Sequence, residues 1–167
     1  MEIRHFTKSD VTQLYDLMCS LRVPEFYLVG ENEELYTSWA RNGLSVCAVE
    51  NDVLIGYLLC DNTRNNYLYQ FDEVIPAIKD LYLSNGIELA NCAVAKEYRG
   101  NRLERKLIQY VLIEQSNKSP KTWFWCTAHK DNVASCKSIV ESGFDLIVED
   151  INFDSTYKHR NVYLHKS

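Results

Sequence analysis

The segment from Cys92 to Gln115 constrains the fold of this 167-residue chain more than any other part of the sequence. It opens with an apolar, strand-like run that ends at Val94, continues through a polar turn over residues 95–102, and becomes helical in pattern from Leu103. The first turn of a helix carries backbone N–H groups without partners, and the helix dipole favours negative charge there. The segment therefore predicts a strand, a tight turn and a helix start that bind an anion, which suits a phosphorylated ligand.

Apolar periodicities predict further strands and helices around this unit. The expected strands are residues 2–6, 45–50, 53–60, 87–94, 122–127, 144–148 and 161–165, and the expected helices are one from Val11 that Pro24 stops, then 31–40, 72–83, 103–115 and 132–142. Asn51 and Asp52 form a two-residue connection typical of a tight hairpin. The order of elements predicts an α/β (mixed α+β) fold, in which a mixed sheet of six to seven strands has helices on both faces, as one domain over residues 1–167.

Composition argues against several classes of partner. A net charge of −5 and a pI near 5.4 argue against a nucleic-acid partner, because binding to a phosphate backbone depends on a basic surface. No charged leader precedes an apolar block, and no apolar run approaches the roughly 18 residues that span a bilayer, so we expect a cytoplasmic protein without a membrane partner. The six cysteines lack CxxC spacing, and His5, His159 and His165 do not pair with them as metal ligands, so we expect buried, reduced thiols and no metal.

Two segments carry a family resemblance. The run from Arg99 to Glu104 aligns with the motif (Gln/Arg)-x-x-Gly-x-(Gly/Ala), with Arg99 as its first residue, and the segment from Asn132 to Gly143-Phe144 looks like an Asn-initiated helix that ends in Gly-Phe. On these segments the chain resembles the GNAT family of acyl-CoA-dependent N-acyltransferases over nearly its whole length. The resemblance implies a GNAT-like sheet and transfer of an acetyl group from acetyl-CoA, by direct attack, to a primary amine of a small molecule or peptide.

The resemblance also implies which residues hold acetyl-CoA, the acyl donor. They are Ala93, Val94, Arg99, Gly100, Asn101, Arg102, Leu103, Glu104 and Asn132. Ala93 and Val94 would hold the pantetheine arm, the residues from Arg99 to Glu104 the pyrophosphate, and Asn132 would contact the cofactor from the next helix. A backbone N–H near Val94 would polarise the thioester carbonyl.

Three positions depart from the family pattern. Arg102 replaces the central glycine of the motif, so it should either adopt ordinary helical angles or push the ligand outward. Glu104 replaces glycine or alanine, and its carboxylate either competes with the pyrophosphate for the helix terminus or points sideways to solvent. Ile139 replaces a tyrosine that many members use to protonate the departing thiolate, so another acid, water, or release as thiolate is needed. These departures keep a second function open, a non-catalytic GNAT-fold protein that binds an acyl-CoA or regulatory ligand.

The acceptor side is less specified. Glu88 is the candidate general base, because it precedes Val94 by six residues and should share its face of the strand; the alternative is a solvated glutamate. Phe26, Tyr27 and Tyr69 are candidate substrate-binding aromatics. His129 either orients a ligand or lies at the surface. We expect an amine substrate as partner, and self-association as a homodimer is plausible from the family although no residue specifies it.

Overall fold

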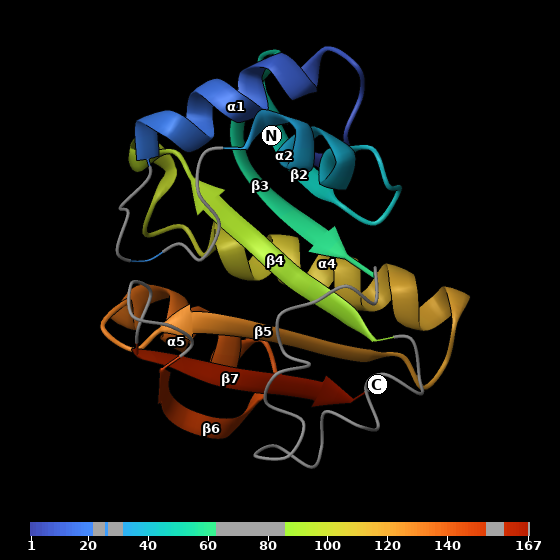
Figure 1. Cartoon of the computed structure of the whole chain (residues 1–167). Coiled ribbons are helices and arrows are strands. Elements are labelled where there is room, and N and C mark those ends of the chain that lie inside the picture. The colour runs from blue at the N-terminus through green and yellow to red at the C-terminus, as the bar shows by residue number, and fades with distance from the viewer. Residues whose placement is uncertain (22–25, 27–31, 63–85, 153–158, 167) are drawn as a thin grey trace.

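A computed structural model describes residues 1–21, 26, 32–62, 86–152 and 159–166 of the chain. These residues form one seven-stranded sheet in the order β1-β2-β3-β4-β5-β7-β6 (Figure 1). Its strands are β1 (Glu2–His5), β2 (Val46–Glu50), β3 (Val53–Asp61), β4 (Ile87–Val94), β5 (Trp123–His129), β6 (Asp145–Asn152) and β7 (His159–Lys166). The β4–β5 pair is parallel and every other pair is antiparallel, which confirms the predicted mixed sheet.

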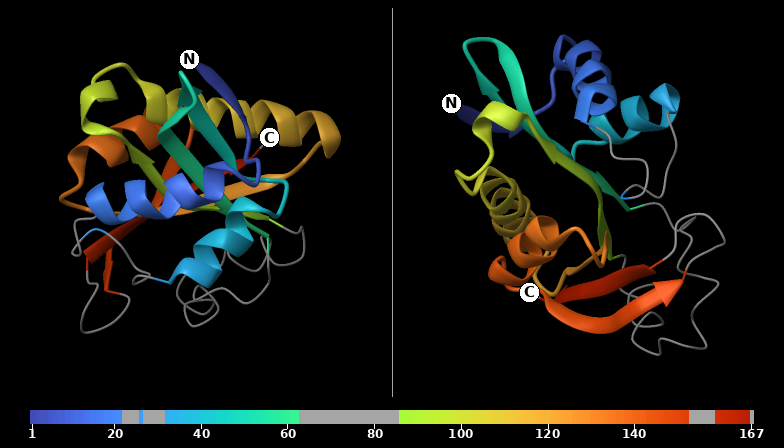
Figure 2. Two further views of the ribbon diagram at one scale, coloured as in Figure 1. Left: turned by 90° about the horizontal axis from the view of Figure 1, so that it is seen from above. Right: turned by 90° about the vertical axis from the view of Figure 1, so that its left-hand side faces the viewer.

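Helices cover both faces of this sheet, as predicted. The helices α1 (Asp10–Leu21) and α2 (Glu33–Ala40) lie on one face, and α4 (Leu103–Lys118) and α5 (Val133–Glu141) lie on the other (Figure 2). A short 3-10 turn, η3 (Lys96–Tyr98), joins β4 to the residues before α4. The helix expected over residues 72–83 lies outside the described residues.

Each face of the sheet has its own hydrophobic core. On β3, Leu58 and Cys60 pack into the core under α4 and α5, whereas Tyr57 and Leu59 pack into the core under α1 and α2. Successive strand residues point to opposite faces, so a strand buried on both faces reads as a continuous apolar run. This explains why β3 is buried from Leu54 to its end.

Local sequence signals set most of the boundaries. Asn51 and Asp52 have φ angles of 51° and 62°, as a two-residue hairpin turn with two left-handed residues requires. Asn32 caps α2, because its side-chain oxygen accepts a hydrogen bond from the N–H of Leu35 at 3.0 Å. The strand predicted over 144–148 instead runs from Asp145 to Asn152, because its pairing with β7 continues that far.

Two irregularities of β4 create the functional region. β4 pairs with β5 only at Ile87–Phe124 and Glu88–Trp125, after which the two strands diverge (Figure 1). On its other edge, Leu59 of β3 pairs with Asn91, but the next residue of β3 pairs with Leu89. Ala90 is therefore an extra residue on β4, which makes a β-bulge.

The described residues contain no helix long and apolar enough to cross a membrane. They also contain no group of three or more His, Cys, Asp and Glu side chains placed to hold a metal ion. All six cysteines are free thiols. Cys47, Cys60 and Cys126 are buried as expected, but Cys19 is exposed on α1, so the expectation of burial is wrong for that residue.

Candidate functional site

A cavity of about 560 Å³ lies where β4 and β5 diverge. Part of its wall comes from the core under α4 and α5, including Leu89, Ile108 and Ile139. Another part, including Trp39 and Ala90, comes from the core under α1 and α2. The cavity is therefore lined from both faces of the sheet, so two reactants that approach from opposite faces can meet inside it.

The β-bulge decides which face Glu88 occupies. Leu89 and Val94 pack against the same core although they are an odd number of residues apart, because the extra Ala90 reverses the alternation. Glu88, next to Leu89, therefore points to the opposite face from Val94, toward α1 and α2. The prediction that Glu88 and Val94 share a face is wrong, because a regular strand was assumed.

Glu88 nevertheless lies in the cavity wall. It is only 6% exposed, and it pairs across the strands with Asp61, which is 9% exposed and also lines the cavity. Acidic side chains usually lie exposed at the surface, but these two are buried. The alternative of a solvated Glu88 is therefore wrong. Two carboxyl groups therefore line the cavity on the side of the sheet that faces α1 and α2, which is called the acceptor half below.

Asn91 fixes the bulge in place. Its side-chain oxygen accepts a hydrogen bond from the hydroxyl of Tyr57 at 3.0 Å, and its amide donates to the hydroxyl of Tyr36 at 3.4 Å. Tyr57 belongs to β3 and Tyr36 to α2, so the amide ties the bulged strand to its neighbour and to the helix above it. A buried polar group with partners on both sides holds the backbone of β4 in one register.

The backbone of β4 presents hydrogen-bonding groups to the opening between the strands. The N–H of Ala95 donates to the carbonyl oxygen of Ile55 at 2.8 Å, so this N–H points toward β3. Backbone groups of successive strand residues point to opposite edges, so those of Val94 and Cys92 point toward the diverging β5. Ala93 directs its backbone groups at β3, so the register does not support its predicted contact with a pantetheine arm, whereas the backbone groups of Cys92 face the opening.

The turn before α4 has the conformation of a glycine-rich loop. Gly100 has φ +80°, and Arg102, the N-cap of α4, has φ 57° and ψ 30°. The sequence predicts that Arg102 either has ordinary helical angles or pushes the ligand outward. The structure shows a third case, because Arg102 adopts the left-handed conformation that glycine would adopt most easily. The turn is anchored by Tyr98, whose hydroxyl donates to a carboxylate oxygen of Glu50 on β2 at 2.8 Å.

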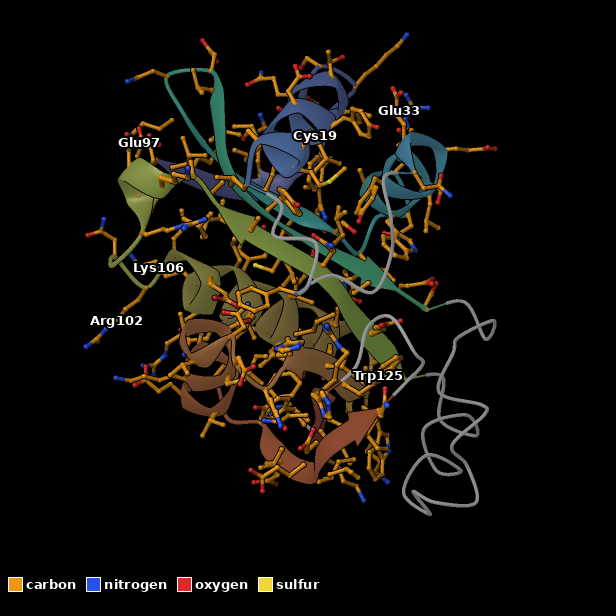
Figure 3. All side chains as sticks on the ribbon, turned by 60° about the vertical axis from the view of Figure 1, so that its left-hand side comes forward. Cys19, Glu33, Glu97, Arg102, Lys106 and Trp125 are labelled. Atoms are coloured by element: carbon orange, nitrogen blue, oxygen red, sulfur yellow. The ribbon has the colours of Figure 1, made fainter. Side chains whose placement is uncertain are left out.

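The N-terminus of α4 is open to an anion. The carbonyl of Arg102 accepts the helical hydrogen bond from the N–H of Lys106 at 3.0 Å, but its side chain makes no capping bond. The three N–H groups before Lys106 thus have no intrahelical acceptor. Arg102 projects outward from this turn (Figure 3), and Arg99 and Lys106 are also exposed, so the segment that leads into α4 carries three exposed cations. Leu103 offers only its backbone, because its side chain is buried in the core.

Glu104 reaches inward from the same helical turn. One of its carboxylate oxygens accepts a hydrogen bond from the hydroxyl of Ser135 on α5 at 2.8 Å, and both residues line the cavity. Burial raises the pKa of Glu104, and the hydrogen bond from Ser135 offsets part of that rise. The alternative in which Glu104 points to solvent is therefore wrong.

The start of α5 lines the cavity beside Glu104, on the side of the sheet that faces α4 and α5, which is called the donor half below. Asn132 caps α5, because its side-chain oxygen accepts a hydrogen bond from the N–H of Ser135 at 3.3 Å, and it lines the cavity. Its contact with a cofactor stays a prediction. Ile139 is one turn beyond Ser135 and also lines the cavity. No proton donor therefore stands at the position where the family pattern has a tyrosine.

His129 is buried in the acceptor half rather than at the surface. It is 8% exposed and lines the cavity, and the centroid of its ring lies 5.3 Å from the centroid of the Phe26 ring. Burial lowers the pKa of His129, and its Nδ1 accepts a hydrogen bond from the N–H of Asp131 at 3.2 Å. The neutral ring therefore carries its proton on Nε2, which makes it a hydrogen-bond donor.

Arg160 connects the segment at Phe26 to the sheet. Its guanidinium donates to the side-chain oxygen of Thr127 at 2.8 Å, to the carbonyl of Thr127 at 2.8 Å and to the carbonyl of Phe26 at 2.9 Å. Arg160 is 6% exposed and lines the cavity together with Phe26. These contacts hold the Phe26 wall against β5 and β7.

The structure thus brings four of the predicted site residues to the cavity wall, namely Phe26, Glu88, Glu104 and Asn132. Ala93, Val94 and the loop residues from Arg99 to Leu103 lie outside that wall, and Tyr27 and Tyr69 lie outside the described residues. Sequence reasoning did not identify Arg160, and it left His129 undecided. The available signal was that both residues lie at strand ends, where side chains of adjacent strands converge.

Comparisons with known proteins agree with this geometry. The profile of the acetyltransferase (GNAT) family matches residues 12–144, which is most of the chain. A comparison with curated proteins found no match.

Solved structures share the fold at low sequence identity. The Salmonella typhimurium protein yncA, solved with its cofactor acetyl-CoA, has a TM-score of 0.75 and 16% identity, with 99% of this chain and 93% of that chain covered. The ribosomal-protein-alanine N-acetyltransferase of Brucella melitensis has a TM-score of 0.73 and 15% identity, with 100% of both chains covered. Naa50 of Arabidopsis thaliana, in complex with a bisubstrate analogue CoA-Ac-MVNAL, has a TM-score of 0.68 and 16% identity, with 98% and 97% covered.

Proposed function

Because this chain belongs to the GNAT acetyltransferase family, we propose that it transfers an acetyl group from acetyl-CoA to a primary amine of a small molecule or peptide. The observation that carries the proposal is the cavity between β4 and β5, whose wall extends from Glu104 in the first turn of α4 to the buried side chains of Asp61 and Glu88. A donor and an acceptor can therefore meet there from opposite faces of the sheet.

The donor half suits acetyl-CoA. The uncapped N-terminus of α4 and the cations Arg99, Arg102 and Lys106 would hold the phosphates. The outward backbone groups of Cys92 would hydrogen-bond the pantetheine arm where β5 has diverged. The carbonyl of Val94 already accepts a hydrogen bond from Nε of Arg99 at 3.2 Å, which leaves its N–H for the donor. Among the described residues that line this half, Glu104 is the acidic side chain whose charge opposes a phosphorylated donor.

The chemistry would be a single displacement. The N–H of Val94 donates to the thioester carbonyl oxygen and stabilises the negative charge that develops there. The neutral amine forms the new C–N bond, the C–S bond breaks, and Glu88, directly or through a water molecule, accepts the proton that the amine loses. With Ile139 in place of a phenol, the thiol leaves as thiolate, which is accessible to a thiol because even the cysteine side chain ionises at a pKa of only about 8.5, far below that of an alcohol.

The acceptor half supports an amine. Asp61 and Glu88 favour a cationic ammonium group as it enters, and the Nε2–H of His129 can donate to an oxygen of the acceptor. Solved structures with this fold include a ribosomal-protein-alanine N-acetyltransferase and a complex with a peptide-bearing analogue, which supports an amine in a protein or peptide as one acceptor class.

A second candidate is a binding protein without transferase activity. Two departures favour it, namely the missing proton donor at Ile139 and the carboxylate of Glu104 in the donor half. In that case acetyl-CoA or another ligand would occupy the cavity without losing its acyl group.

Release of CoA thiol from acetyl-CoA, measured over a panel of primary amines, tests the first candidate. Glu88→Gln should lower kcat at neutral pH by about 10²-fold or more, because it removes the proton acceptor. Glu97→Gln is the matched control, since it removes one carboxylate that is exposed on η3, and its kcat should not change. Full turnover by Glu88→Gln would exclude Glu88 as the base, and saturable binding of acetyl-CoA without thiol release for any amine would favour the second candidate.

A further inference from the structure

The Glu104–Ser135 contact is the feature of the cavity that donor binding does not explain. Glu104 lies in the first turn of α4, whose free N–H groups form the anion site, yet its side chain carries a negative charge of its own. The hydroxyl of Ser135 holds this carboxylate at 2.8 Å, against α5 and in the cavity wall. Arginine and lysine side chains around the turn are exposed, whereas Glu104 is partly buried.

We propose that Glu104, held by Ser135, is a selectivity element for the acyl donor: it disfavours the phosphates of CoA while leaving the uncharged pantetheine arm unaffected. This inference rests on the proposed function, because it assumes that a pantetheine thioester enters the donor half. It assigns Glu104 a role in how tightly different pantetheine-bearing molecules bind, and it assigns Ser135 the role of positioning residue.

The physical basis is the difference in charge between parts of the donor. A carboxylate and a diphosphate at one helix terminus compete for the same dipole and repel each other. Solvent and salt screen the exposed arginine and lysine side chains of the turn more strongly than they screen a charge in the cavity wall. The pantetheine arm contains only neutral amide and hydroxyl groups, so the charge of Glu104 has little effect on its binding.

The test is isothermal titration of the purified protein with CoA, 4′-phosphopantetheine and pantetheine. Glu104→Gln keeps the shape and a hydrogen-bond acceptor for Ser135 but removes the charge. It should tighten CoA by about tenfold, equivalent to about 1.4 kcal/mol, and 4′-phosphopantetheine by less, because it carries fewer charges. The affinity for pantetheine should change by less than about twofold, equivalent to about 0.4 kcal/mol, because pantetheine carries no charge.

Two further variants serve as controls. Glu97→Gln removes an exposed carboxylate from the nearby η3 turn and should leave all three affinities unchanged. Ser135→Ala keeps the charge of Glu104 but removes its tether, so it should tighten CoA by less than Glu104→Gln does. Thermal melting of each variant shows whether it is folded at the titration temperature.

The outcomes separate this proposal from the proposed function. Equal tightening of CoA and pantetheine in Glu104→Gln would overturn it, because the effect would then be steric. Weaker CoA binding would also overturn it, because Glu104 would then be a favourable donor contact. If the wild type and Glu104→Gln bind CoA equally and the wild type acetylates an amine, the proposed transferase activity holds and the proposed role of Glu104 is wrong. If Glu104→Gln binds CoA more tightly than the wild type but neither protein acetylates any amine, the proposed role of Glu104 holds and the proposed transferase activity is wrong.

Discussion

Replacement of Asp10 by asparagine should destabilise the protein by about 2 kcal/mol at pH 7. Asp10 begins α1, is 3% exposed, and accepts hydrogen bonds from Arg4 at 2.6 and 3.1 Å. It also accepts from the N–H and the hydroxyl of Thr7, each at 2.6 Å. Burial acts to raise the pKa of Asp10, but these hydrogen bonds outweigh it and lower the pKa from 3.8 to about 2. A pKa lowered from 3.8 to about 2 corresponds to about 2.5 kcal/mol of differential stability, which sets the scale of the expected loss.

The sign of the pH dependence follows from that shift. The carboxyl group has a lower pKa in the folded protein than in the unfolded chain, so its contribution is fully present above about pH 4 and is lost as the pH falls toward 2. Urea unfolding of the wild type and Asp10→Asn at pH 7 and at about pH 3 should therefore give a smaller difference at the lower pH. Asp16→Asn, at an exposed position of the same helix, is the control. An equal loss at both pH values would refute the electrostatic reasoning, because the cost would then come from packing.

Two other substitutions test the turn and the acceptor wall. Arg102→Gly should raise the free energy of unfolding by about 0.5 kcal/mol. A left-handed conformation costs a residue with a side chain about 1 kcal/mol, and the greater backbone entropy of glycine in the unfolded chain offsets part of that gain. Thermal melts should show no such rise for Arg102→Ala. Arg160→Lys should lower the free energy of unfolding by about 2 kcal/mol in urea, because an ammonium group cannot replace three guanidinium hydrogen bonds to Thr127 and Phe26; an unchanged midpoint would contradict this role.

The sheet could be predicted because its signals are local. Alternation and apolar runs identify strands wherever one face or both are buried, and Asn51-Asp52 identifies the hairpin because few residue pairs accept two positive φ angles. The helix starts were equally readable, since Asn32 and Asn132 both cap the helix that follows. Fold and family follow from such features because each involves residues that are close in sequence.

The bulge at Ala90 could not be predicted, and it changes the reading of the site. Nothing in the run from Ile87 to Val94 marks the extra residue, because alanine is acceptable in either a regular or a bulged strand. The pairing partner on β3 decides it, through contacts between residues that are far apart in the sequence. For this reason the sequence alone places Glu88 on the face of Val94, whereas the bulge places it on the opposite face.

His129 and Arg160 illustrate a second limit of local reasoning. Each looks like a loop or strand-end polar residue, which is exposed in most proteins. Their burial depends on Phe26, whose ring covers His129 and whose carbonyl accepts a hydrogen bond from Arg160, although 134 residues separate Phe26 from Arg160. Only the tertiary fold brings these residues together at the acceptor wall.

The departures from the family motif affect backbone and charge differently. Arg102 changes the side chain but retains the left-handed turn, because the hydrogen bonds of Tyr98 and the following helix fix the path of the chain on both sides. Glu104 changes the charge inside the cavity, and Ser135 provides the hydrogen bond that a buried carboxylate needs. A motif can therefore lose its central glycine and keep its shape, whereas an added carboxylate alters which ligands that shape will hold. Donor affinity at this site is accordingly expected to depend on residue 104 more than on residue 102.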